Sequence, residues 1–180
     1  YDLGSSTGAI SLALALNNKN KNNTFIAIDN SAEMVKKCQA NLFNKIDNLQ
    51  VLCSDITDTE INDASIVVLN LTLQFIDVGA RAALLKKIYD GLNPGGVLII
   101  SEKIHFEDPE TQDHITKLHL DFKRENGYIE LEIANKRQAI ENVMITETKK
   151  THIDRLRDCG FRETSCYFQC LNFVSFLSVK

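Results

Sequence analysis

The sequence predicts a single α/β domain with a doubly wound, mostly parallel sheet of seven strands, and three observations predict it. Short apolar segments alternate with helical segments through the first half of the chain, as in a parallel sheet that is covered by helices on both faces. A glycine-rich turn, residues 4–8 (GSSTG), separates the first strand from the first helix. Two strand-like segments then lie close together at the end of the chain, which predicts a final antiparallel pair.

The first half of the chain supplies five strands. Leu3 ends a first strand, and the segments 24–28 (TFIAI), 49–53, 65–69 (SIVVL) and 97–100 are the apolar runs expected of buried strands. Right-handed crossovers between such parallel strands produce the doubly wound arrangement.

Helices separate these strands. Residues 8–16 are rich in Ala and Leu, and Ser31 is well placed to cap a second helix, which runs through Met34 and beyond. Residues 80–92 form an amphipathic helix, and the turn 93–96 (NPGG) is expected to end it.

The second half differs from this alternation. Residues 102–150 are polar and helical without a clear strand, and they are too charged to form a core of their own, so we predict a helical insert. The segment 151–157 is a last helix, and 163–170 and 173–179 are the terminal strand pair. The length of 180 residues fits one domain spanning 1–180.

Composition excludes several classes of protein. The net charge of −4 gives no basic surface for direct nucleic-acid binding, and no run of 18 apolar residues exists that could span a membrane. The five cysteines lack the spacing of a zinc site, so we expect no metal and reduced thiols in the core of a cytoplasmic protein. The four histidines are expected at exposed helix positions. Because the chain opens at the end of a strand, a segment is expected to precede it.

The loop after the first strand is a candidate ligand site. Gly4 allows a tight turn, the small residues Ser6 and Gly8 allow a ligand to approach the main chain, and the amides at the start of the helix face a negative group. A carboxylate of a methionine moiety is the expected group. A simple tight turn between a strand and a helix would have the same composition.

Polar residues end the next three strands. Asp29 ends the second strand, where an acid binds the hydroxyls of a ribose. Asp55 and Ile56 follow the third strand and are expected beside an adenine, and Asn70 ends the fourth strand. Each acid alone is compatible with a solvated loop carboxylate, but the carboxyl ends of neighbouring parallel strands are where open α/β sheets bind ligands.

The spacing of the loop distinguishes two cofactor classes. Dinucleotide-binding folds use G-x-G-x-x-G, whereas this chain has Gly4-x-Ser6-x-x-Ala9. The methyltransferase pattern D/E-x-G-x-G-x-G matches Asp2-x-Gly4-x-Ser6-x-Gly8 with one change, from glycine to serine. The sequence therefore favours S-adenosyl-L-methionine and a fold of the class I methyltransferase type.

Several longer segments resemble the carboxy-S-adenosyl-L-methionine synthases. The resemblance covers the whole chain, and its distinctive part lies in the helical insert. The matching segments are 27–31 (AIDNS), 67–75 (VVLNLTLQF), 85–96 (LKKIYDGLNPGG), 121–128 (DFKRENGY), 136–137 (KR), 141–144 (ENVM) and 168–173 (FQCLNF).

The resemblance implies a set of site residues. Those that would hold the cofactor are Gly4, Ser5, Ser6, Asp29, Asn30, Asp55, Ile56 and Asn70. Arg137 matches the arginine that binds the carboxylate of the carboxylated cofactor, because a guanidinium offers two parallel donors to such a group. By its own sequence context, Lys136-Arg137 favours a solvated helix face, and only the resemblance reverses that interpretation.

The resemblance also implies a reaction and partners. S-adenosyl-L-methionine and prephenate would become carboxy-S-adenosyl-L-methionine and phenylpyruvate, without a metal or a protein nucleophile. The product would pass to an enzyme that carboxymethylates the wobble uridine of tRNA, and the family is dimeric, with the insert as a candidate dimer surface. Two alternatives stay open: an ordinary methyltransferase acting on a small molecule or RNA, and a non-catalytic cofactor-binding partner of a tRNA-modifying enzyme.

Overall fold

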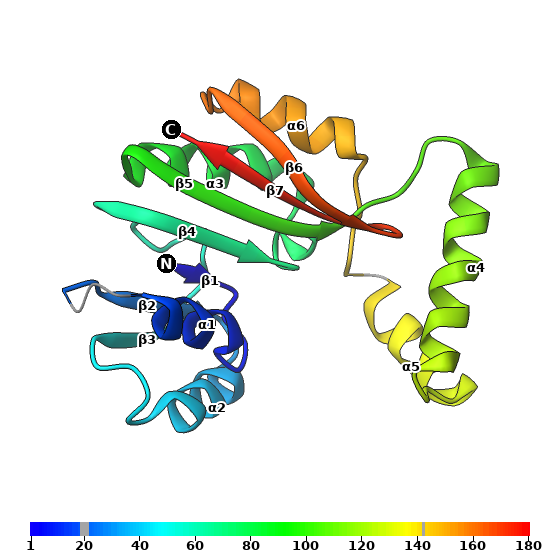
Figure 1. The fold of residues 1–180 in the computed structure, drawn as a ribbon, viewed down its shortest axis with the longest axis horizontal. Helices are drawn as coiled ribbons and strands as arrows, with labels where there is room; N and C mark the ends of the chain where they lie inside the picture. Colours follow the sequence, from blue (N-terminus) through cyan, green and yellow to red (C-terminus); the bar gives the residue numbers. More distant parts are fainter. Residues whose placement is uncertain (19–21, 142) are drawn as a thin grey trace.

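The computed structural model describes residues 1–18, 22–141 and 143–180, so that Asn142 of the segment 141–144 lies outside the described residues. Its sheet has the order β3-β2-β1-β4-β5-β7-β6. The first five strands are parallel, and β7 runs antiparallel to both β5 and β6. This confirms the predicted sheet and its antiparallel ending (Figure 1). The strands are β1 Asp2–Leu3, β2 Phe25–Asp29, β3 Leu49–Cys53, β4 Ala64–Asn70, β5 Leu92–Lys103, β6 Glu163–Cys170 and β7 Phe173–Val179.

Helices cover both faces of the sheet because neighbouring residues of each strand point to opposite sides. Ala27 of β2 packs with Cys38 and Leu42 of α2, whereas the next residue, Ile28, belongs to the core on the other face. That second core contains apolar side chains of α3 and α6. The helices of these layers are α1 Ala9–Asn17, α2 Ala32–Leu42, α3 Val78–Gly91 and α6 Lys149–Asp158, and a short 3-10 helix, η1, spans Leu73–Phe75.

The turn 93–96 does not separate α3 from β5 as the sequence predicted. The strand already begins at Leu92, which pairs with Ala64, and pairing resumes between Ile66 and Val97. The four residues between these pairs loop out, with Gly95 at a φ of +76°. The helix-ending signal was therefore correct, but β5 is longer than the predicted 97–100.

The insert forms two helices, α4 Pro109–Glu125 and α5 Glu130–Glu141, which contact each other. They lie beyond the carboxyl ends of β1 and β4 (Figure 1). The expectation that 102–150 contains no strand was wrong at its edges. β5 extends to Lys103, and Ile104 forms a bridge with Glu147. No helix among the described residues has the length and apolar character needed to cross a membrane.

Two smaller expectations also need correction. Cys53 and Cys170 are exposed, so they are not core thiols, because β3 and β6 are the edge strands of the sheet. His152 of α6 is buried rather than exposed, and its ring lies 5.8 Å from that of Phe176.

Candidate functional site

The loop after β1 is held against the end of β2. The backbone amides of Gly4 and Ser5 both donate to the carbonyl of Ile28, at 2.8 and 2.9 Å. Gly4 has a φ of +76° and Ser6 a φ of +48°, so the chain turns sharply here. The carbonyl of Ser5 accepts from the amide of Gly8 at 2.8 Å. Ser5 is buried and shapes the loop, whereas Ser6 is exposed at its tip.

Asp29 connects this loop to the start of α2. Its Oδ2 accepts from the amide of Ser6 and its Oδ1 from the amide of Ser31, both at 2.9 Å. Ser31 in turn caps α2, as predicted, by accepting from the amide of Met34. Each carboxylate oxygen keeps a further lone pair for a ligand. The structure therefore brings Asp29 and the glycine-rich loop together, as the spacing predicted.

Gly8 has a different role from the predicted one. A Cβ at this position would lie 2.6 Å from Cδ1 of Leu42 and 2.8 Å from Sγ of Cys38. The space beside Gly8 is thus filled by α2, and its small size allows α1 and α2 to pack rather than a ligand to approach.

Asp2, the acid of the methyltransferase pattern, is buried and structural. Its Oδ2 accepts from the backbone amide of Ser11 at 3.0 Å and from its hydroxyl at 2.7 Å. Burial raises the pKa of Asp2, and the two hydrogen bonds from Ser11 oppose that rise. Asp2 therefore fixes the first turn of α1 in the position that the loop requires.

The loop after β3 is braced by a lysine that the sequence did not single out. Lys87 of α3 donates to the carbonyls of Ile56, Thr57 and Thr59 at 2.7 to 2.9 Å. The carboxylate of Asp55 accepts from the amide and hydroxyl of Thr57, and these hydrogen bonds lower its pKa. The side chain of Ile56 belongs to the core, so only its backbone is available to line a site.

The segment after Asn70, at the end of β4, is held by a buried acid. Glu102 of β5 accepts from the backbone amides of Thr72, Leu73 and Gln74 at 3.1, 2.8 and 3.1 Å. Burial raises the pKa of Glu102 to about 7, although the three amides oppose the rise. Sequence reasoning missed Glu102, because the residues that it binds lie about thirty positions earlier in the chain.

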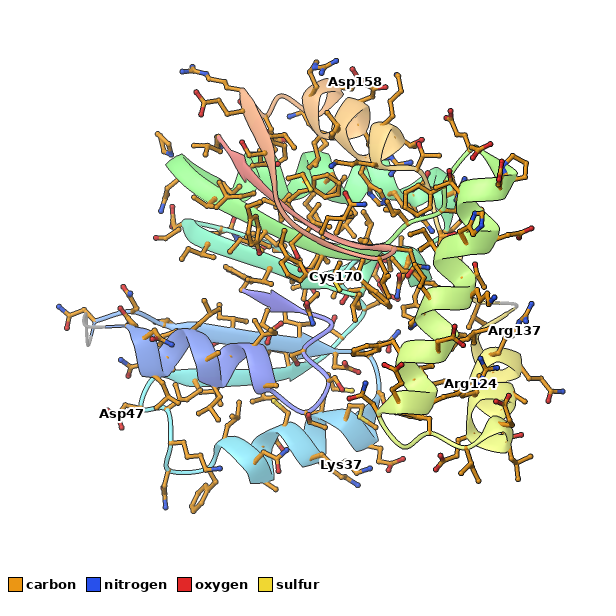
Figure 2. All side chains as sticks on the ribbon, turned by 45° about the vertical axis from the view of Figure 1, so that its right-hand side comes forward. Lys37, Asp47, Arg124, Arg137, Asp158 and Cys170 are labelled. Atoms are coloured by element: carbon orange, nitrogen blue, oxygen red, sulfur yellow. The ribbon has the colours of Figure 1, made fainter. Side chains whose placement is uncertain are left out.

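Arg137 lies on the exposed surface of α5 (Figure 2). Its positive charge is one of the causes that lower the pKa of Lys103 at the end of β5, after burial and the charge of Lys123. Within the described part of the chain, Arg137 forms no ion pair with an acidic side chain. Its positive charge is therefore available to a ligand.

The donor set fits an adenosyl cofactor. Asp29 and Asp55 supply acceptors at the ends of neighbouring strands, and the exposed Asn30 lies beside Asp29. Asn70 ends β4, which is separated from β2 in the sheet by β1 alone. Among the described residues, no group of three His, Cys, Asp or Glu side chains is arranged to hold a metal ion.

Comparison with known proteins gives the same assignment. Residues 1–96 match the family of methyltransferase domains. A carboxy-S-adenosyl-L-methionine synthase of Ruthia magnifica is 62% identical over 180 residues, which are 100% of this chain and 76% of that protein. A carboxy-S-adenosyl-L-methionine synthase of Shewanella oneidensis is 50% identical over 182 residues, which cover 100% of this chain and 75% of that protein.

The chain belongs to the carboxy-S-adenosyl-L-methionine synthase family. The methyltransferase match ends at residue 96 and so contains every predicted site residue except Arg137. The synthases match the whole chain, including α4 and α5. The insert is therefore shared with this family and lies outside the general methyltransferase match.

Solved structures share the fold. Human N-acetylserotonin methyltransferase in complex with SAM has a TM-score of 0.65 and 18% identity, over 99% of this chain and 46% of that one. An O-methyltransferase family 2 protein from Planctomyces limnophilus has a TM-score of 0.70 and 18% identity, over 99% and 49%. These likenesses confirm the class I methyltransferase fold.

Proposed function

We propose that this protein converts S-adenosyl-L-methionine and prephenate to carboxy-S-adenosyl-L-methionine and phenylpyruvate. One observation carries the proposal: the identity to carboxy-S-adenosyl-L-methionine synthases extends over the complete chain, including the insert that holds Arg137. In this reaction prephenate loses one carboxyl group as CO2 together with its hydroxyl group, and the methyl group of the sulfonium loses a proton and gains that CO2. The hydroxyl and the proton leave as water.

Each residue of the site would have a separate part in binding the cofactor or the new carboxylate. Asp29 would bind the ribose hydroxyls, since its carboxylate is already held in place by two backbone amides. Asp55 and the backbone of Ile56 would border the adenine, and Asn70 would line the crevice. Arg137 would hold the new carboxylate, because a guanidinium pairs with a carboxylate through two parallel hydrogen bonds. The protein would thus contribute proximity and charge placement rather than a nucleophile.

The partners are part of the same proposal. We propose a cytoplasmic homodimer whose product passes to a tRNA-modifying enzyme. The insert supports the dimer, because Leu118, Phe122 and Leu131 are 53, 56 and 65% exposed on α4 and α5. Leu118 and Phe122, four residues apart, share one face of α4, and large exposed apolar side chains that lie together can mark interaction sites. Sedimentation should give the mass of two chains, and Phe122→Asp should give the mass of one.

A substitution of Arg137 tests the proposed function. Arg137→Ala should weaken binding of the carboxylated cofactor about tenfold or more while leaving the affinity for S-adenosyl-L-methionine nearly unchanged. Arg124→Ala is the matched control, because Arg124 is neutralised by Asp121 and Glu130. Calorimetry with both cofactors measures the difference. An ordinary methyltransferase would show equal affinities for the variant and the unmodified protein with either cofactor.

A further inference from the structure

Two lysines and a histidine from two different elements meet beside the end of β5. Lys103 is the last residue of β5 and pairs with Phe173 of β7 in the antiparallel ladder. His119 of α4 packs its ring on Phe173, with the centroids 5.3 Å apart. Lys123 lies one turn further along α4, on the same face. Phe173 therefore fixes the base of a cluster formed by Lys103, His119 and Lys123, which we name the basic cluster.

The side chains of the basic cluster have no acidic ion-pair partner among the described residues. Lys103, His119 and Lys123 are half-buried. Burial and positive neighbours lower the pKa of each. The neighbours are Lys123 and Arg137 for Lys103, and chiefly Lys123 and Lys103 for His119, whose pKa falls to about 4. His119 is therefore neutral at pH 7, and the cations of the cluster are Lys103 and Lys123. Two neighbouring lysines without a partner acid among the described residues are the arrangement expected of a site that binds an anion.

The position of the basic cluster connects it to the candidate site. Ser101 pairs with Asn70 at the end of β4, and Lys103 follows two residues later on β5. Lys103 thus lies at the same carboxyl edge of the sheet as the predicted cofactor residues. The helices α4 and α5 face this edge from beyond it (Figure 1), and Arg124 and Arg137 mark the two helices in Figure 2.

We propose that Lys103 and Lys123 bind the carboxylate of a small 2-oxo acid, the one that prephenate keeps when it becomes phenylpyruvate. This inference rests on the function proposed above and adds the site of the second substrate. Of the two carboxylates of prephenate, the one that is kept in phenylpyruvate is the suitable partner for these lysines. A cation against the carboxylate that departs as CO2 would stabilise the starting ion and oppose the reaction. Arg137 is then left for the carboxylate that forms on the cofactor.

Binding of phenylpyruvate tests this proposal without turnover. Calorimetry on the full-length protein with S-adenosyl-L-methionine present should show phenylpyruvate binding weakened about tenfold or more in Lys103→Gln/Lys123→Gln. Lys103→Arg/Lys123→Arg, which keeps both charges, should retain most of the affinity. The control Lys45→Gln/Lys117→Gln removes two exposed lysines outside the cluster and should bind as the unmodified protein does. Circular dichroism checks that each variant is folded.

The steady-state constants separate the failure of this inference from that of the proposed function. If the unmodified protein forms carboxylated product, the glutamine double variant should raise the KM for prephenate about tenfold while the KM for S-adenosyl-L-methionine stays within about twofold. Equal phenylpyruvate affinity in the double variant and the unmodified protein would overturn the inference, as would no binding by either. An unmodified protein that binds phenylpyruvate through these lysines but forms no carboxylated product would instead contradict the proposed function alone.

Discussion

Thr72 leaves no space for a side chain on Gly4. A Cβ at Gly4 would lie 2.5 Å from both Cγ2 and Oγ1 of Thr72. The loop after β1 therefore packs directly on the segment after β4, and Glu102 holds that segment through the amide of Thr72. Three segments distant in sequence thus define one wall of the candidate site.

Gly4→Ala should lower both stability and cofactor affinity. Gly95 provides a matched control, because its φ is also +76° but a Cβ there would meet no atom within 4 Å. Gly95→Ala should cost only the backbone strain, about 1–2 kcal/mol, whereas Gly4→Ala should cost about 1–3 kcal/mol more because of the crowding. Denaturant unfolding measures both. Adding Thr72→Ala should recover part of the extra loss, and equal losses in the two single variants would refute the packing explanation.

Asp29→Asn should weaken binding of S-adenosyl-L-methionine by about 10- to 100-fold. The amide side chain keeps one acceptor oxygen and places an NH2 group against the amide of Ser6 or Ser31. A lost hydrogen bond to a charged group is worth about 1.5–3 kcal/mol. Asp63→Asn, in the exposed turn before β4, should leave the affinity unchanged. Calorimetric affinities that agree for the two variants would contradict the role of Asp29.

Glu102 should make stability depend on pH. Burial raises its pKa from 4.5 to about 7 in the folded protein. The folded state therefore holds the proton more tightly, and the stabilisation is complete below pH 4.5 and is lost as the pH rises towards 7. The upper limit of the loss is about 3 kcal/mol.

Glu102→Gln should remove this slope, because glutamine does not titrate. The quantity to follow is the difference in the free energy of unfolding between the variant and the unmodified protein at each pH. Burial lowers the pKa of His152 to about 4, so that His152 makes stability rise with pH over part of the same range. Unfolding in denaturant at several pH values measures the difference, and parallel curves for the two proteins would show that Glu102 does not titrate there.

The buried ion group of Arg81, Glu147 and Arg155 should be important for stability. Arg81 is fully buried and contacts Glu147 at 2.5 Å, and Arg155 also pairs with Glu147. Burial would raise the pKa of Glu147, but the hydrogen bonds and charges of Arg155 and Arg81 lower it to about 2. Glu147→Gln should cost about 3–5 kcal/mol, because two cations would lose their partner.

An exposed ion pair provides the comparison for that loss. Lys86→Ala breaks the pair with Asp90 on the surface of α3 and should cost less than about 1 kcal/mol. Both variants are measured by denaturant unfolding. Similar losses in the two would mean that Glu147 is not the centre of a buried ion group.

Local signals in the sequence predicted most of the fold. The strands 49–53, 163–170 and 173–179 have the predicted bounds. The first and the last are largely apolar runs, and 163–170 and 173–179 are two strand-like segments separated by a short turn. The start of β5 could not be predicted in this way. Leu92 joins the strand because it pairs with Ala64, and such pairing depends on a distant segment.

The residues of the candidate site likewise fall into those that the sequence could predict and those that it could not. Asp29 could be predicted, because its position at the end of a strand determines its role. Glu102, Thr72 and Lys87 could not, because each acts on backbone groups or a glycine that lie far away in the sequence. The close packing of Gly8 on α2 likewise appears only when the helices are placed.

The most direct test of the proposed function is the mass of the product. Full-length protein is incubated with S-adenosyl-L-methionine and with prephenate that carries ¹³C in the carboxyl group attached to its ring. Mass spectrometry should find a cofactor heavier by one labelled CO2, together with phenylpyruvate. Two results would contradict the proposal. One is methylation of an added acceptor with release of S-adenosylhomocysteine, and the other is folded protein that forms no heavier cofactor.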